Sequence, residues 1–172
     1  SYKHFDPVGE MYAEAIKYFK KLKPTASYIS GLNATLKDGF PVFTEWNDPA
    51  ADAKYPKKGA LSCKKNYIIG IGDTNTNYDW NLSGTPYGAP ADVDGAMGSK
   101  VTAKAWTDEV GTLEGIGSLG LKGISNGSYY IAGVAYYAHS SDLRSDISGI
   151  QTVDTYWMDV MESGYVSKNQ YW

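Results

Sequence analysis

The sequence feature that most constrains the fold is an unbroken apolar run at residues 66–72, Asn-Tyr-Ile-Ile-Gly-Ile-Gly, which is flanked by polar residues. Runs of this length that are rich in β-branched residues are typical of strands buried on both faces. Strands of that kind occur in parallel sheets with helices on both sides. The run therefore predicts a central strand of an α/β domain.

An amphipathic helix is predicted ahead of this strand, from about Pro7 to Leu22. Apolar residues recur there at three- and four-residue spacing, at Val8, Met11, Tyr12, Ala15, Ile16, Phe19 and Leu22. Charged residues fill the other face, at Glu10, Glu14, Lys17, Lys20 and Lys21. Asp6 suits the N-cap position and Pro7 suits the first helical position. We therefore expect the helix to start close to residue 7.

Three further elements are predicted after the central strand: helices near 101–113 and 129–138, and a strand at 152–160. Residues 24–62 are expected to be a long irregular insertion, because proline and glycine interrupt every periodicity, with short strands near 40–45. The order helix, strand, helices, strand is typical of an α/β domain with a mostly parallel sheet and flanking helices. Residues 1–172 are accordingly interpreted as a single domain.

Composition excludes several classes of function. The formal net charge is -3 and the basic residues are scattered, so nucleic-acid binding is not expected. No apolar run approaches the roughly 20 residues that a transmembrane helix needs. Aromatic residues are unusually frequent, with 15 Tyr and 5 Trp. They suit adhesive surfaces and subunit interfaces, and the alternative is a tyrosine-rich core and rim.

The single cysteine, Cys63, cannot form a disulfide within the chain. The first residues lack the basic region and the apolar stretch of a signal peptide. We therefore expect that any export signal lies upstream and that the chain is a piece of a longer protein.

A loop rich in side-chain oxygens follows the predicted central strand. Asp73, Asn75, Asn77 and Asp79 alternate with other residues, and oxygens at every second position can wrap around Ca²⁺ or Mg²⁺. The alternative is an Asx-rich turn that hydrogen-bonds to its own backbone, and composition alone favours that turn. Position favours a ligand site, since ligands bind outside the carboxyl ends of strands in open α/β sheets. Asp6 is expected at the same edge.

Other motifs do not indicate catalysis. The Gly-x-Gly-x-x-Gly pattern at 115–120 follows a helical pattern rather than a strand, so it is not interpreted as a dinucleotide site. His4 and His139 do not have metal-ligand spacing, and no histidine is indicated as a partner for Cys63. Asp142, Arg144 and Asp146 are interpreted as a solvated ion-pair turn. No catalytic residue is assigned, and the chain is not expected to be an enzyme.

Several segments together resemble PilY-type proteins of type IV pilus systems. The helix opening Pro-Val-Gly-Glu at 7–10, the run Cys-Lys-Lys-Asn-Tyr-Ile-Ile at 63–69 and the helix 130–138 are similar to segments of that family. The turn 142–144 and the strand 151–156 are similar as well, and all five occur in the family's order.

The resemblance implies a von Willebrand factor A-like, Rossmann-like α/β domain in a large secreted protein. In that domain type a divalent metal is held by an Asp-x-Ser-x-Ser loop, a threonine at a helix start and an aspartate after a later strand. Asp73 matches the last position, and Asp6 stands where the threonine is expected. The Asp-x-Ser-x-Ser loop is absent from this sequence, so the chain is expected to lack the first strands of the domain and to bind metal weakly alone. The alternatives are a portion of a longer protein, a separate chain whose partner supplies the missing strands, and a diverged module that has lost the metal site.

Three functions follow as hypotheses. The first is surface adhesion or type IV pilus assembly, in which a pilus-associated protein outside the cell binds pilus subunits, other chains or host ligands through the metal-bearing edge. The second is a structural subunit of an extracellular filament without metal dependence. The third, a hydrolase with a metal-bound water at Asp73, has the least support because no general base is recognisable.

Overall fold

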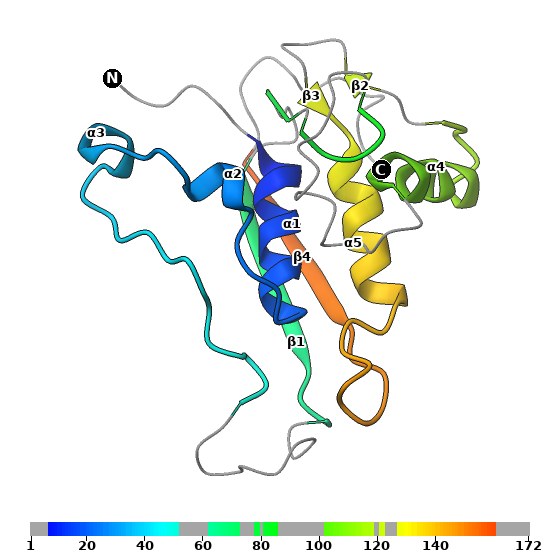
Figure 1. Cartoon of the computed structure of the whole chain (residues 1–172). Helices are drawn as coiled ribbons and strands as arrows, with labels where there is room; N and C mark the ends of the chain where they lie inside the picture. Colours follow the sequence, from blue (N-terminus) through cyan, green and yellow to red (C-terminus); the bar gives the residue numbers. More distant parts are fainter. Residues whose placement is uncertain are drawn as a thin grey trace.

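The computed structural model describes residues 7–51, 62–72, 78–79, 81–85, 102–118, 121–122 and 127–160. Its elements, in chain order, are α1 (Val8–Phe19), α2 (Ala26–Ile29), α3 (Ala34–Lys37), β1 (Asn66–Gly72), α4 (Ala103–Leu113), β2 (Leu121–Lys122), β3 (Gly127–Ser128), α5 (Tyr130–Ser140) and β4 (Val153–Asp159). The protein is thus a mixed α/β structure, as the sequence predicts (Figure 1). None of the helices in these ranges is long and apolar enough to span a membrane.

The two longer strands form a parallel pair. β1 lies beside β4 with Asn66 opposite Val153 and Gly72 opposite Asp159. The indole of Trp157 lies over Gly70, where an added Cβ would come within 2.0 Å of the ring. β2 and β3 form a separate antiparallel pair. The prediction of parallel strands at 66–72 and 152–160 is confirmed.

Helix α1 begins one residue later than predicted, with Pro7 rather than Asp6 at the N-cap, and it ends earlier than predicted. Lys21 adopts a left-handed backbone conformation with φ of 59°. The Lys21 N–H donates to the carbonyl of Tyr18, and the Leu22 N–H donates to the carbonyl of Lys17. These two bonds form a Schellman motif, which closes a helix by satisfying its last carbonyls. Leu22 therefore lies outside the helix although its spacing fits the apolar stripe.

Helices α1 and α5 cover one face of the β1–β4 sheet, and α4 packs against α5. The core between them includes the fully buried side chains of Ile16, Val134 and Val153. The α4–α5 contact is close at Gly133, where an added Cβ would lie 2.4 Å from the backbone nitrogen of Thr107. Glycine at this position lets the two helix backbones approach each other.

The structure corrects the predicted burial of β1. Its residues alternate between half-buried and exposed, and Ile69 is 72% exposed. Helices cover only one face of the sheet in the described part of the chain, so the apolar side chains on the other face remain bare. The prediction of a strand buried on both faces was wrong for this structure.

Two further predictions need correction. Residues 40–45 form no strand, and the regular structure within residues 24–51 is instead the short helices α2 and α3. The side chain of Arg144 is only 6% exposed, which excludes a solvated turn. It donates to both carboxylate oxygens of Asp48 at 2.8 and 3.1 Å and to those of Asp146 at 2.8 and 3.2 Å. Arg144 thus ties the insertion to the turn after α5.

Candidate binding edge

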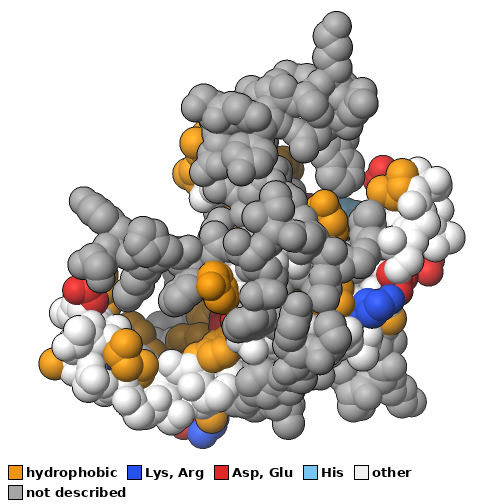
Figure 2. All heavy atoms as spheres, turned by 90° about the horizontal axis from the view of Figure 1, so that it is seen from above, with side chains coloured by type: hydrophobic (Ala, Val, Ile, Leu, Met, Phe, Trp, Pro, Cys, Tyr) orange, Lys and Arg blue, Asp and Glu red, His pale blue; other side chains and the backbone are white. Residues whose placement is uncertain are grey.

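One edge of the molecule gathers the carboxyl ends of the strands and the starts of the helices. β1 and β4 are parallel and end together, and the Val160 N–H donates to the carbonyl of Gly72 at 2.8 Å. α1 and α5 run back along the sheet, so both begin at this edge, at the top of Figure 1. We call it the carboxyl edge. Seen from above (Figure 2), hydrophobic side chains of the described residues reach the surface at several places, and at the right of the view some adjoin an acidic side chain.

Asp79 is the central residue of this edge. Its side chain is fully buried, one carboxylate oxygen accepts the backbone N–H of Glu10 at 3.1 Å, and the other accepts the hydroxyl of Ser128 at 2.9 Å. The first N–H groups of a helix have no partner within the helix, and Pro7 supplies no side-chain cap. Asp79 therefore caps α1 from a distant part of the sequence and also binds Ser128, two residues before α5 begins.

The environment of Asp79 disfavours its charged form. Burial raises the pKa of this carboxyl to about 6, while the hydrogen bonds from Ser128 and from the start of α1 oppose the shift and the nearby Glu10 carboxylate adds to it. Gly9 permits the close approach, because an added Cβ there would lie 2.7 Å from a carboxylate oxygen of Asp79 and 2.9 Å from Leu82. The contact thus depends on glycine at position 9.

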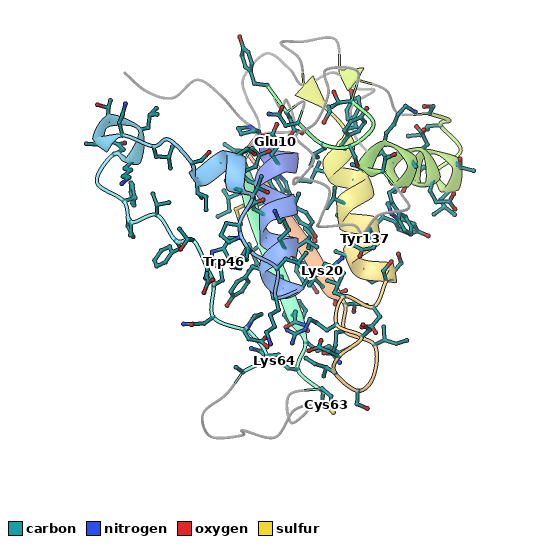
Figure 3. All side chains as sticks on the ribbon, in the orientation of Figure 1. Glu10, Lys20, Trp46, Cys63, Lys64 and Tyr137 are labelled. Carbon is teal, nitrogen blue, oxygen red and sulfur yellow. The ribbon has the colours of Figure 1, made fainter. Side chains whose placement is uncertain are left out.

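Glu10 extends the cluster toward the insertion. It is 7% exposed, and its carboxylate accepts the N–H of Asn81 at 2.9 Å and the hydroxyl of Tyr28 at 3.0 Å. Burial, followed by the nearby Glu10 carboxylate, raises the pKa of Tyr28 well above its usual value. Glu10 lies at the upper end of α1 in Figure 3. It therefore joins α1 to α2 and to the segment that carries Asp79.

A second group of hydrogen-bonded side chains lies one turn further along α1. Glu14 accepts the N–H of Thr25 at 3.1 Å and also its hydroxyl, and the Lys17 ammonium donates to the Thr25 hydroxyl at 2.5 Å. Lys17 and Thr25 are buried. The sequence pattern places Glu10, Glu14 and Lys17 on the face of α1 opposite its apolar stripe. In the structure the start of the insertion packs against that face and buries Glu10 and Lys17.

The segment around Asp79 also organises the other helix starts. The Ser83 hydroxyl oxygen accepts the N–H of Ala103 at 2.7 Å, at the start of α4. The Tyr130 hydroxyl, from the first residue of α5, donates to the carbonyl of Gly84 at 3.3 Å. Asp79, Ser83 and Gly84 therefore hold the starts of α1, α4 and α5 in one arrangement.

Four of the five predicted metal ligands, Asp6, Asp73, Asn75 and Asn77, lie outside the described residues. Asp6 and Asp73 directly adjoin Pro7 and Gly72, which lie at the carboxyl edge. Asp79 is described, and one of its oxygens accepts the Glu10 N–H while the other accepts the Ser128 hydroxyl. Among the described residues, no group of three or more His, Cys, Asp or Glu side chains is arranged to hold a metal ion.

Cys63 and His139 take no part in this edge. Cys63 is exposed and lies before β1, at the opposite end of the strand (Figure 3). His139 is near the end of α5, where its Nδ1 lies 2.8 Å from a carboxylate oxygen of Asp154. Sequence reasoning missed Ser128 and Tyr28, since nothing in their local sequence distinguishes them from other hydroxyl residues.

Comparison with known proteins assigns the family. Residues 2–124 match the sequence model of the family described as "PilY1 homolog, second domain". The chain belongs to this family, as its resemblance to PilY-type proteins predicts. It is 35% identical, over 195 aligned residues, to the type IV pilus biogenesis factor PilY1 homolog of Xylella fastidiosa. The alignment covers 99% of this chain and 15% of that relative. No solved structure matches the chain.

Proposed function

We propose that this chain is part of a type IV pilus biogenesis protein and that it binds another protein chain at the carboxyl edge. Family membership supports a role in pilus biogenesis, and with it a pilus-associated location outside the cell. The main observation in support of this binding site is that the ends of β1 and β4 lie together with the starts of α1 and α5 (Figure 1). Ligands of open α/β sheets bind at such an edge.

The finer proposal is a von Willebrand factor A-like domain that binds its partner with the help of Ca²⁺ or Mg²⁺. Asp6 and Asp73, with Asn75 and Asn77, would supply oxygens to the cation, and such a cation would offer a partner carboxylate an open coordination position. Asp79 would act as a positioning residue, because its hydrogen bonds fix the start of α1. Support for the cation comes from the residue types and from the position of Pro7 and Gly72 at the edge.

We propose binding rather than catalysis for this edge. The carboxylates of Asp79 and Glu10 are the acidic groups buried there in the described residues. They accept hydrogen bonds from the Glu10 and Asn81 N–H groups and from the Ser128 and Tyr28 hydroxyls. A general acid or base needs to reach a substrate proton. These two carboxylates are occupied in holding the fold, which suits a rigid binding surface.

A cation titration separates the proposed roles. In the full-length protein, calorimetry with Ca²⁺ and with Mg²⁺ should show binding that falls at least tenfold in Asp73→Ala. Asp79→Asn should bind the cation with nearly unchanged affinity, because its oxygens are directed at Glu10 and Ser128. Equal affinity in wild type and Asp73→Ala would contradict the cation site, as would an absence of binding by the wild type.

A second candidate function is a structural subunit of an extracellular filament, in which metal plays no part. The bare apolar face of the β1–β4 sheet favours it, because exposed apolar patches mark contact surfaces. Purified full-length protein that assembles into rings or filaments in the presence of a chelator, as seen by electron microscopy, would support this function over the first.

A further inference from the structure

The β1–β4 sheet has one face covered by helices and one face that is bare. Five large apolar side chains lie on the bare face, with exposures of 51% for Tyr67, 72% for Ile69, 67% for Ile71, 60% for Tyr156 and 62% for Met158. We call these five residues the apolar sheet face. The carboxyl edge does not include it, so this inference is independent of the binding site proposed there. It is an alternative to the filament subunit, which would use the same face for contacts between molecules.

The strand register makes this face continuous. Residues opposite each other in a parallel pair point to the same side of the sheet, and Ile69 is opposite Tyr156 while Ile71 is opposite Met158. The rings of Tyr67 and Tyr156 lie 6.0 Å apart. The five side chains thus form two adjacent rows. The positions that share their side, 67, 69, 71, 154, 156 and 158, include no lysine or arginine.

On the opposite face of the sheet, helices cover the side chains of β1 and β4. There Val153 is fully buried, and the hydroxyls of Thr155 and Tyr12 are hydrogen-bonded at 2.5 Å under α1. Parallel sheets are almost always covered on both faces, since the crossovers that join parallel strands place helices there. A sheet of only two strands is also rarely stable by itself, and it needs further strands or a packed helix.

We propose that an amphipathic helix of the same polypeptide, from outside residues 1–172, packs on the apolar sheet face with its apolar stripe. The length of the relative supports this occupant, because the chain aligns with only 15% of the X. fastidiosa protein and the family is described as a second domain. The face suits an apolar stripe, since it offers no basic side chain for an acidic partner. The parallel strand order favours a helix over a second sheet.

Photo-crosslinking in the full-length protein identifies the occupant. Benzoylphenylalanine replaces Tyr156 in one sample and, as a matched control, Phe40, which is 73% exposed on the insertion. After irradiation, mass spectrometry should find position 156 joined to a helix-forming peptide from outside residues 1–172 of the same molecule. Mixing isotope-labelled and unlabelled protein shows whether a link lies within one molecule or between two. A link to a second copy would overturn the proposal, as would a yield no higher than at position 40.

Thiol labelling gives a second readout that requires no identified peptide. In a Cys63→Ser background, Ile69→Cys should react with a maleimide at least tenfold more slowly than Ile150→Cys in the native full-length protein. Ile150 is 76% exposed and lies away from the sheet face, in the turn before β4. Both thiols should react equally fast in denaturant, which controls for intrinsic reactivity. Equal rates in the native protein would show that the face is open and would overturn the proposal.

Discussion

Asp79 accepts a hydrogen bond from the backbone N–H of Glu10, a residue 69 positions earlier in the chain, at 3.1 Å. The contact places a carboxylate at the positive end of the α1 dipole, where negative charge is stabilising. The second oxygen of Asp79 binds Ser128, so one buried side chain sets the relative position of α1 and α5. The geometry of the carboxyl edge therefore depends on this residue.

Loss of the Asp79 side chain should destabilise the protein. Asp79→Ala removes the cap and leaves the Glu10 N–H and the Ser128 hydroxyl without this partner, which should cost about 1–3 kcal/mol. Urea unfolding followed by circular dichroism measures this change in the free energy of unfolding. Glu109→Ala, on the exposed side of α4, is the matched control and should change stability by less than about 0.5 kcal/mol. Equal stability of the two variants would contradict the capping role.

Asp79 also predicts a pH dependence of stability. Its folded-state pKa of about 6 lies above the ordinary 3.8, so the folded state binds more protons than the unfolded state between these values. The resulting contribution, at most about 2–3 kcal/mol, is complete below pH 3.8 and is lost as the pH rises through 6. Thermal unfolding from pH 4 to 7 should show this loss in wild type.

Asp79→Asn is the control for the titration, because the amide can still accept the Glu10 N–H but does not ionise. The difference between wild type and Asp79→Asn should therefore change across pH 4 to 6 and become constant well above pH 6. Parallel curves for the two proteins over this whole range would show that Asp79 titrates normally.

Arg144 predicts a second, separate stabilising contact. Its guanidinium holds the pKa of Asp48 at about 2, below the ordinary 3.8. A depressed carboxyl pKa stabilises the fold above pH 3.8, and this contribution is lost as the pH falls toward 2, opposite in direction to the effect of Asp79. Arg144→Ala should cost about 1.5–3 kcal/mol, because it removes charged hydrogen bonds from a nearly buried site.

Limited proteolysis is the second readout for Arg144. Cleavage within residues 40–51 should become faster in Arg144→Ala, since Asp48 is no longer tied to the turn after α5. Lys23→Ala removes an exposed ion pair with Glu45 in the same insertion and serves as the control. It should leave the stability and the cleavage rate nearly unchanged, because solvent screens this exposed pair. Faster cleavage in both variants alike would contradict a specific role for Arg144.

The sequence predicted the parts of the fold that depend on local patterns. The spacing of Tyr12, Ile16 and Phe19 predicted α1, and the run at 66–72 predicted β1. The same run did not reveal that Ile69 is exposed, because apolar residues on a bare face and on a covered face have the same sequence pattern. Exposure depends on which elements pack nearby, and that is a tertiary property.

The candidate site was predictable in position but not in detail. The Asx-rich loop after β1 marked the carboxyl edge, and Asp79 lies in that loop. Its partners are Glu10, in the first turn of α1, and Ser128, at the end of β3, and only the folded chain brings them together. Glu10 carried a misleading signal, since a glutamate on the polar side of an amphipathic helix is usually solvated.

The most direct test of the proposed function is the number of pili on cells that lack the gene and carry a plasmid copy. Wild type and Glu109→Ala should restore surface pili counted by electron microscopy, whereas Asp73→Ala, at an equal protein level, should not. The Asp73→Ala protein should retain its unfolding midpoint, which separates loss of binding from loss of fold. Full restoration of pili by Asp73→Ala, or normal pili without the gene, would contradict a pilus function that acts through the carboxyl edge.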